Sequence, residues 1–355
     1  MKKIIAVLSA VVMLAVLLSG CSMLEKLNDT MRDLDGNSNI KTTSGEPTAK
    51  STSQTSASAV PAVNTAESGV SYKYKADMKL GETTDAGTCA FKLDRLQESN
   101  FLSVLGGSAG FECSNQNALF LDGVFELTNN SGSTAKLGDI IAVQAGTETQ
   151  SFSSAFFAVE KDGALKQGAE LANGETAVVH CAVEVDKSLS GDITYGLVAG
   201  ETYYNTIFKA GTITAPTDKK IEKGKSKYVN GSFQLDMAGA LYEEKVSPGN
   251  NSYVTYNVST EGDIFTVVKL DYSNLTDKKL NPSQIMTGAI FSGNTDYYKC
   301  LVVTQSDDGK NLSDSEMCEA GAKKTVYFMA ETKPGEPKNG TLCVNINGAT
   351  YYFSY

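Results

Sequence analysis

Leu119–Asn129 reads LFLDGVFELTN, and Ile264–Asn274 reads IFTVVKLDYSN. Toward the end of both segments apolar and polar side chains alternate, which places the apolar side chains on one face of a β-strand. The two segments therefore predict equivalent strands in two copies of one domain. The matched positions are Phe125 with Leu270, Leu127 with Tyr272, and Asn129 with Asn274.

Other pairs of segments repeat in the same order along the chain, at a nearly constant offset. Any one match can arise by chance, but an ordered series is typical of duplication with small loop insertions. The sequence therefore predicts two tandem domains, connected like beads by the segment between them. The pairs are Phe91–Asp94 with Phe233–Asp236, Asp162-Gly163 with Asp308-Gly309, and Gly200–Tyr204 with Gly348–Tyr352.

The chain after Tyr72 is predicted to be β-strand throughout, because turns such as Asn173-Gly174 separate its short apolar runs. About seven short strands per copy, each with one apolar face, favour two sheets packed face to face. The predicted fold class is all-β, with two tandem immunoglobulin-like β-sandwich domains, and a barrel is the alternative. The runs of the first copy are Thr88–Leu96, Ala118–Thr128, Ile140–Ala145, Phe152–Val159, Thr176–Val185, Ile193–Ala199 and Tyr203–Phe208.

Residues 1–20 have the form of an export signal, with two lysines before an apolar stretch from Ile4 to Leu18. This stretch is shorter than the roughly 20 residues that a membrane-spanning helix needs. It ends in Leu18-Ser19-Gly20-Cys21, which resembles the lipobox of bacterial lipoproteins, whose cysteine receives a diacylglyceryl group before cleavage. We therefore predict a lipid anchor on Cys21 at the extracytoplasmic face of a cell membrane. An ordinary secretory signal with a chance cysteine is the alternative.

Composition and the repeats divide the rest of the chain. Gly36–Ser71 is rich in Ser, Thr, Ala, Gly and Pro and has almost no large apolar residue, so it is predicted to be a flexible tether. The predicted organisation is a lipoprotein signal peptide at 1–20, the lipidated cysteine with a short amphipathic segment and the tether at 21–71, a first β-sandwich at 72–214, a linker at 215–227 and a second β-sandwich at 228–355.

Charge argues against one class of partner. The chain has 31 Lys and Arg side chains against 41 Asp and Glu side chains, which is a formal net charge of −10. Such a surface repels nucleic acid, and no cluster of basic residues offsets the repulsion locally. No nucleic-acid partner is therefore expected.

The sequence identifies no catalytic residue. Its one histidine, His180, lies beside Cys181, but neighbours on a strand point to opposite faces, so a Cys/His nucleophile pair is not favoured. The acidic pairs Asp307-Asp308 and Glu243-Glu244 are the first suspects for a glycosidase, although acid pairs in turns are usually solvated. His180 is interpreted as a structural residue, and no enzymatic activity is predicted.

No metal or cofactor is predicted either. Gln305–Asn311 is acidic and contains glycine, but it lacks the ligand spacing of an EF-hand, so a plain turn is favoured over a calcium loop. Paired tyrosines could contact carbohydrate or protein, yet their alternation also suits a sandwich core. These pairs are Tyr203-Tyr204, Tyr297-Tyr298 and Tyr351-Tyr352.

The cysteines after Cys21 do not define a disulfide framework. Export permits disulfides, but the copies do not place their cysteines at matching landmarks. Buried free thiols and bridges remain equally open. The cysteines are Cys89, Cys113 and Cys181 in the first copy, and Cys300, Cys318 and Cys343 in the second.

The lipobox, the Ser/Thr-rich tether and the repeated units resemble uncharacterised immunoglobulin-like extracellular domains of lipoproteins from Gram-positive bacteria. The units are FELTNNSG or LDYSNLTD followed by GDIIAVQAG or SQIMTGAIF. The resemblance covers most of residues 72–355 and implies the fold more than a function. The family has no common assigned activity, and some related domains resemble secreted immunoprotective proteins.

The favoured hypothesis is a membrane-anchored, non-enzymatic lipoprotein that acts as a binding or structural module at the cell envelope. Its partners would be the membrane, through the lipid on Cys21, and an envelope protein or glycan. The alternatives are a solute-binding lipoprotein of a transporter and a cell-wall hydrolase. The sequence predicts neither the ligand nor the oligomeric state.

Overall fold

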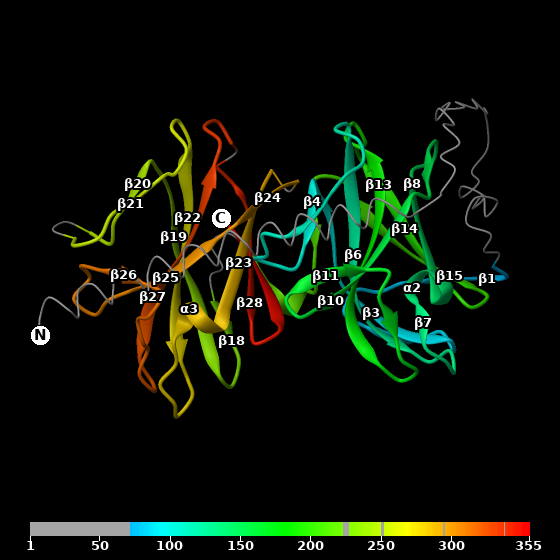
Figure 1. Cartoon of the computed structure of the whole chain (residues 1–355), viewed down its shortest axis with the longest axis horizontal. Helices are drawn as coiled ribbons and strands as arrows, with labels where there is room; N and C mark the ends of the chain where they lie inside the picture. Colours follow the sequence, from blue (N-terminus) through cyan, green and yellow to red (C-terminus); the bar gives the residue numbers. More distant parts are fainter. Residues whose placement is uncertain (1–71, 223–226, 250–251, 294, 337) are drawn as a thin grey trace, which may run out of the picture. The chain divides into compact units, whose positions relative to one another are not determined.

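The computed structural model describes residues 72–355 apart from 223–226, 250–251, 294 and 337 (Figure 1). The predicted signal peptide at 1–20, the lipidation site Cys21 and the tether lie outside the described residues. Within the described part, strands follow one another with only short helical turns, so the predicted all-β fold class is confirmed. No helix in this part is long and apolar enough to cross a membrane.

The first sandwich consists of two sheets. One has the strand order β1-β15-β14-β8-β9, and the other has the order β11-β10-β13-β6-β3-β16, with β2 also paired to β3. β1 runs parallel to β15, whereas the other pairs are antiparallel. The strands are β1 (Tyr74–Asp77), β2 (Thr83–Asp85), β3 (Cys89–Ser99), β6 (Ala118–Asn129), β8 (Ile141–Gly146), β9 (Ser151–Phe152), β10 (Ala155–Lys161), β11 (Ala164–Gln167), β13 (Thr176–Asp186), β14 (Asp192–Ala199), β15 (Thr202–Lys209) and β16 (Ile213–Thr214).

The second sandwich repeats this topology. Its sheets have the orders β17-β29-β28-β23-β24 and β18-β19-β22-β27-β25-β26, and β17 is again parallel to the last strand. The predicted duplication is therefore visible in the strand order. The strands are β17 (Lys220–Ile221), β18 (Lys227–Val229), β19 (Phe233–Glu243), β22 (Ile264–Asn274), β23 (Met286–Ser292), β24 (Asp296–Lys299), β25 (Leu301–Gln305), β26 (Leu312–Ser313), β27 (Lys323–Thr332), β28 (Gly340–Ile346) and β29 (Ala349–Ser354).

Short elements complete each copy. In both sandwiches a two-stranded hairpin lies between the first two long strands, and a single helical turn precedes the next strand. The hairpins are β4–β5 (Phe101–Ser103, Gly110–Glu112) and β20–β21 (Lys245–Val246, Tyr256–Asn257). The remaining elements are β7 (Ala135–Lys136), β12 (Glu170–Leu171), the helices α2 (Leu137–Ile140) and α3 (Pro282–Ile285), and the 3₁₀ helix η1 (Thr217–Lys219).

A buried asparagine marks the same position in both copies. The side-chain nitrogen of Asn129 donates to the carbonyls of Ser133 and Leu171, at 2.8 Å each. The side-chain nitrogen of Asn274 likewise donates to the carbonyls of Lys278 and Cys318, at 2.6 and 3.2 Å. Buried backbone carbonyls beyond the end of a strand have no partner in the sheet, so they need side-chain donors of this kind. The Asn that ends each quoted segment therefore stabilises the turn that follows it.

Strand register corrects two of the sequence matches. Cys89 pairs with Asn129 and Phe233 pairs with Asn274, so Phe233 is the counterpart of Cys89 rather than of Phe91. The shift is two residues, which keeps the same face toward the core and is invisible to an alternation pattern. In the last hairpin, Ala199 pairs with Thr202 and Ile346 pairs with Ala349, which shifts that match by one residue.

Each sandwich has its own apolar core between its two sheets. In the first core Phe91, Phe125 and Tyr195 are at most 1% exposed, and in the second Tyr272 and Phe328 are equally buried. Burial of such side chains stabilises the fold by roughly 1.5–3 kcal/mol each. In each sandwich, the sheet that contains β6 or β22 has one face that points away from the core, and this face is called the outer face. The β4–β5 hairpin covers part of it in the first sandwich, and the β20–β21 hairpin covers part of it in the second.

The two sandwiches contact each other, so the expectation of separate beads is wrong. Leu105, beside the β4–β5 hairpin, packs in one apolar cluster with Phe291 and Tyr352 of the second sandwich. The backbone N–H of Gly106 donates to the Tyr297 hydroxyl at 2.7 Å, and the described residues of both sandwiches belong to one compact unit. The predicted linker at 215–227 also begins the second sandwich, because β17 within it pairs with β29.

Candidate functional site

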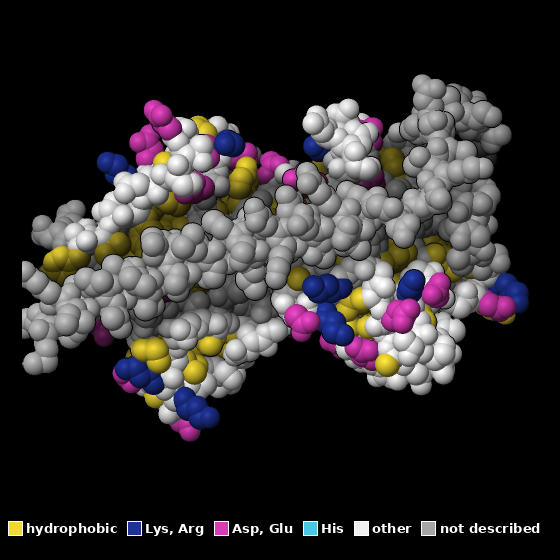
Figure 2. Space-filling model, viewed as in Figure 1, with side chains coloured by type: hydrophobic (Ala, Val, Ile, Leu, Met, Phe, Trp, Pro, Cys, Tyr) yellow, Lys and Arg dark blue, Asp and Glu magenta, His cyan; other side chains and the backbone are white. Residues whose placement is uncertain are grey.

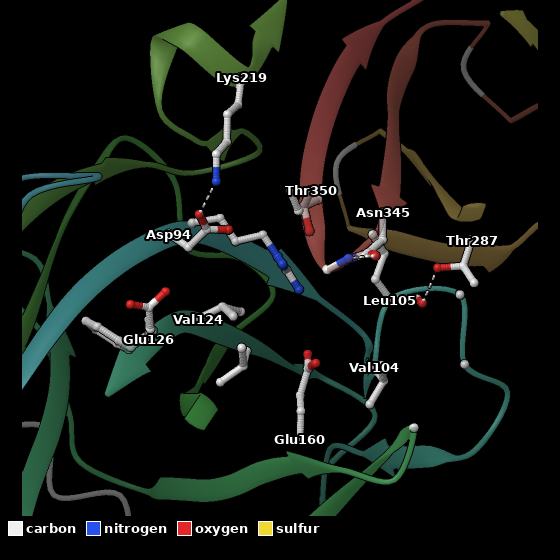
Figure 3. Close-up of a pocket in the computed structure, with 18 of the residues that line it drawn as sticks. Asp94, Val104, Leu105, Val124, Glu126, Glu160, Lys219, Thr287, Asn345 and Thr350 are labelled. Atoms are coloured by element: carbon white, nitrogen blue, oxygen red, sulfur yellow. Dashed lines mark hydrogen bonds and ion pairs between the residues drawn. The ribbon is translucent and has the colours of Figure 1, made fainter. Parts of the chain in front are cut away.

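A cavity of about 590 Å³ lies between the outer face of the first sandwich and the second sandwich. The first sandwich contributes side chains from β3, β6, β10 and β13 together with the segment Val104–Gly107. The second contributes Thr287 from β23, Asn345 from β28 and Thr350 from β29. Figure 3 shows Glu160 and Lys219 entering from opposite sides of this cleft. Its size lies in the range of roughly 300–1,000 Å³ that is typical of small-molecule sites.

His180 occupies the centre of a buried charge cluster next to the cleft. Its Nδ1 is 2.9 Å from Oδ2 of Asp122, and its Nε2 is 3.0 Å from Oε1 of Glu160. His180 and Asp122 are 0% exposed, whereas the Glu160 side chain is 25% exposed and lines the cleft. Glu160 therefore connects the buried pair with the ligand space.

The imidazole of His180 is held in its charged form. Burial opposes protonation, but the charge and hydrogen bond of Asp122, together with Glu160, outweigh burial and raise the pKa of His180 to about 9. At neutral pH both ring nitrogens therefore carry protons and donate to the two carboxylates. The cluster thus holds one cation between two anions, which fixes the orientation of the Glu160 carboxylate.

Arg95 extends the cluster toward the second sandwich. It is 4% exposed, and its Nε donates to Oε1 of Gln97 at 3.1 Å. The Nε2 of Gln97 in turn lies 3.4 Å from Oδ2 of Asp122. The guanidinium of Arg95 also lies close enough to the hydroxyl of Tyr352 on β29 to interact with it electrostatically. Arg95 thereby links the buried His180 pair to the other domain.

The chain of contacts ends at an ion pair. The Tyr352 hydroxyl lies 3.4 Å from Oδ2 of Asp94, and Oδ1 of Asp94 accepts from Lys219 at 3.1 Å (Figure 3). The charged members alternate in sign from one end to the other, which limits the cost of burying them. We call this set the polar network. Its members are Lys219, Asp94, Tyr352, Arg95, Gln97, Asp122, His180 and Glu160.

A local irregularity positions the network. The register between β3 and β6 shifts between Leu93 and Arg95, so Asp94 is an extra residue on β3. Such a bulge re-aims the side chains that follow it. Asp94 and Arg95 can therefore both line the cleft, although they are neighbours in the chain.

The second sandwich has a bulge at the same place, but the five matching positions of its outer face carry no charged residue. Register pairs the two faces position by position. The counterparts of Asp122 and His180 belong to an apolar cluster with Phe265 and Met329, and the counterpart of Gln97 packs against it. The counterparts are Val267 for Asp122, Tyr327 for His180, Gln305 for Glu160, Leu241 for Gln97 and Gly239 for Arg95. The fold therefore does not require the polar network.

The candidate catalytic and calcium-binding residues of the sequence analysis, apart from His180, lie outside the polar network. Cys181 faces the core on the opposite side of β13 from His180, so no Cys/His pair forms. Glu243 and Glu244 are exposed, and Asp307 is 88% exposed and pairs with Lys324 at 2.7 Å. The carboxylate of Asp308 accepts from Ser306 and from the backbone of Lys310, which makes this segment a turn. In the described part of the chain, no group of three His, Cys, Asp or Glu could hold a metal ion.

The tyrosine pairs divide between core and groove. Tyr203, Tyr204, Tyr351 and Tyr352 are buried, as the structural interpretation requires. Tyr297 and Tyr298 are half-buried and line a second groove of about 420 Å³ in the second sandwich, with Tyr256, Leu301 and Met329. Only this pair keeps the possibility of contact with a ligand.

All six cysteines of the described part are free thiols. Five are buried, and Cys113 is half-buried. Burial raises the pKa of the Cys89 and Cys113 thiols to about 11, so both are protonated at neutral pH. They behave as small apolar residues.

Comparison with known proteins gives no functional assignment. No model of a known protein family matches the chain, and no curated protein matches it. Among solved structures, an uncharacterised β-sandwich protein from Clostridium difficile aligns over 40% of this chain and 97% of its own length, at 15% identity and a TM-score of 0.34. A conserved hypothetical protein from Bacillus anthracis aligns over 36% of this chain and 90% of its own, at 17% identity and a TM-score of 0.25. Likenesses of this size say nothing about function.

Proposed function

We propose that this protein is a non-enzymatic binding protein, anchored outside the cytoplasm by lipid on Cys21, which holds its ligand in the cleft between its two sandwiches. The observation that carries the proposal is the polar network. Buried charges that a fold does not need, placed beside a cleft, are characteristic of functional sites. The second sandwich supplies the comparison, because it builds the same strands around an apolar cluster.

The state of His180 supports binding rather than catalysis. A general base must have a free nitrogen near neutral pH, whereas both nitrogens of His180 face carboxylates and its pKa is raised to about 9. The neighbouring Cys181 thiol faces the opposite side of the sheet and has a pKa raised far above its ordinary value by burial. These groups therefore hold a carboxylate in place more readily than they activate a nucleophile.

The anchor rests on the lipobox and the tether. A diacylglyceryl group carries two acyl chains, which would give lasting attachment where a single chain would be marginal. A Cys21→Ser precursor is expected to leave the membrane fraction, while the unchanged chain stays in it. Full retention of the Cys21→Ser chain in the membrane fraction would contradict the anchor.

The surface agrees with a ligand other than nucleic acid. Figure 2 shows Lys and Arg side chains interspersed with Asp and Glu on the visible face of the described residues, and the formal net charge of the chain is −10. Nucleic-acid binding requires basic side chains gathered along a surface. We therefore place the ligand among polar small molecules or peptides.

A pair of matched variants tests the cleft. Val178 is 38% exposed and lines the cleft, whereas Leu301 is 47% exposed and lines the groove of the second sandwich. The full chain, purified from its native envelope, is examined by native mass spectrometry. We expect a bound small molecule with the unchanged chain and with Leu301→Trp, and its loss with Val178→Trp. Equal occupancy in all three proteins would overturn the cleft as the site.

A second candidate function is binding of an envelope protein or glycan through the groove around Leu301. The observation that favours it is the aromatic lining, since Tyr256 and Tyr298 offer apolar faces with polar edges. The same pair of variants separates the two functions. A macromolecular partner that is lost with Leu301→Trp and kept with Val178→Trp supports the groove.

A further inference from the structure

The cleft carries opposite charges at its two ends. Glu160 enters from β10, and Lys219 enters from η1 on the opposite side (Figure 3). Two further ionised side chains of the lining, Lys92 and Glu126, form an ion pair of 2.9 Å. This pair is neutral, and so is the pair of Lys219 with Asp94, which also lines the cleft. The excess charges are therefore the positive charge of Arg95 at the Lys219 end and one negative charge of Asp122 and Glu160 around His180 at the other end.

The Glu160 end is arranged to receive a cation. One oxygen of its carboxylate accepts from His180, and the side chain remains 25% exposed toward the cleft. Its orientation is therefore fixed before a ligand arrives, which reduces the entropy lost on binding. A carboxylate held in this way favours an ammonium group as its partner.

The Arg95 end is arranged to receive an anion. A guanidinium has five N–H donors in a planar fork. The Nε–H of Arg95 donates to Gln97, and the carboxylates of Asp94 and Asp122 lie close enough to raise its pKa. Arg95 lines the cleft, and Lys219 lies on the same side through its contact with Asp94. Guanidinium groups bind carboxylates in a bidentate manner.

We propose that the cleft binds a short peptide with free termini, whose ammonium group contacts Glu160 and whose carboxylate contacts Arg95 and Lys219. The inference rests on the proposed binding function and specifies its ligand. The charges of the network and of the Lys92–Glu126 pair cancel, with four cationic and four anionic groups, so the site suits a zwitterion better than an ion of one sign. The cavity of about 590 Å³ has room for a peptide of a few residues.

The test uses the full lipidated chain in detergent, and its melting temperature is measured against the concentration of added tripeptide. The probes are trialanine, its N-acetylated form, its C-terminal amide and a neutral disaccharide. We expect trialanine to stabilise the chain, and each blocked form to bind at least about tenfold more weakly, as loss of a charged hydrogen bond implies.

Variants assign the termini to the two ends. The Glu160→Gln chain is expected to bind the acetylated peptide and the free peptide about equally. The Lys219→Met chain is expected to bind the peptide amide and the free peptide about equally. The matched controls are Lys279→Met and Glu319→Gln, which alter an exposed ion pair of the second sandwich and are expected to keep the full preference.

The outcomes separate this inference from the proposed function. Binding of the blocked peptides or the disaccharide as tightly as trialanine, with loss in Val178→Trp, would overturn the zwitterion and keep the cleft. Absence of stabilisation by every probe would overturn the peptide and leave the cleft to the mass-spectrometric test. Binding that Val178→Trp leaves unchanged would overturn both.

Discussion

The outer faces of the two sandwiches have the same strands in the same order, but they hold different chemistry. The outer face of β3, β6, β13 and β10 buries His180 between Asp122 and Glu160. The matching face of β19, β22, β27 and β25 packs Val267 and Tyr327 among apolar side chains. Apolar packing is the less demanding way to fill such a face, because buried ions need exact partners. The difference supports the proposed role of the first face in binding a ligand.

Some contacts beside the two outer faces are the same in both sandwiches. Ser114 donates to Glu184 through both its backbone and its hydroxyl, and Ser259 makes the same pair of contacts with Glu331. These contacts hold the segment that follows the covering hairpin in each copy. These contacts, which stabilise the fold, are thus repeated in both sandwiches, whereas the polar network lies on the outer face of the first sandwich only.

The largest expected effect is the loss of Asp122. An Asp122→Ala chain leaves the His180 and Arg95 charges without their buried partner, so the free energy of unfolding is expected to fall by roughly 3–5 kcal/mol. Urea denaturation followed by circular dichroism measures it. A change below about 1 kcal/mol would show that the network stores no buried charge and that the two faces differ less than their residues indicate.

Stability should also depend on pH through His180. Its folded pKa of about 9 lies above its unfolded value of 6.5, so the protonated form favours folding. This contribution is complete below pH 6.5 and is lost as pH rises through 9. We expect the free energy of unfolding to decline from pH 6.5 to about 7.5, where unfolded thiols, with pKa values of about 8.5, are still mostly protonated.

The control for this pH dependence replaces His180 with tyrosine, the residue type at the matching position of the second sandwich. A His180→Tyr chain, which carries at this position the residue type of its counterpart Tyr327, is expected to lose the decline between pH 6.5 and about 7.5. An identical decline in both chains would mean that other groups cause it.

Grafting the second face onto the first tests whether the fold needs the polar network. The chain carries Asp122→Val, His180→Tyr, Glu160→Gln and Gln97→Leu, with Arg95→Met to fill the space that Gly239 leaves in the other copy. Replacing a buried ion network with apolar residues is often neutral or stabilising by about 1–4 kcal/mol. Thermal unfolding measures the result. A graft that fails to fold would show that the network is structural.

The smallest expected effect concerns the contact between the copies. Tyr297→Phe removes the hydroxyl that accepts from Gly106, and the expected loss is about 0.5–1.5 kcal/mol. Tyr298→Phe is the neighbouring control, because its hydroxyl contacts Glu336 within the second sandwich. We expect Tyr297→Phe alone to separate the unfolding transitions of the two sandwiches in a denaturant titration. Coincident transitions in both variants would contradict the coupling.

Much of the fold could be predicted from the sequence, since strand alternation and the ordered matches depend on neighbouring residues. The two-residue shift of Phe233 was not predictable, because alternation keeps its period when a strand slides by two. The bulge at Asp94 leaves no local signal either. Contact between the sandwiches was missed because Leu105 and Phe291 belong to segments far apart in the chain.

The site was less predictable than the fold. His180 is the one histidine of the sequence, but its partners lie 58 and 20 residues away along the chain, so the sequence shows no cluster around it. Only the pairing of β6, β13 and β10 brings Asp122 and Glu160 to it. One signal was available: Asp122 and His180 are polar residues inside strands whose counterparts, Val267 and Tyr327, belong to an apolar face.

The most direct test of the account compares ligand binding by the unchanged chain and by the five-residue graft. Both are prepared as full lipidated chains in detergent, and trialanine is titrated while the melting temperature is recorded. The account predicts that the graft folds at least as stably, to within about 1 kcal/mol, and gains no stability from the peptide, whereas the unchanged chain does. A graft that the peptide stabilises as much as the unchanged chain would contradict the claim that the polar face of the first sandwich is the binding site.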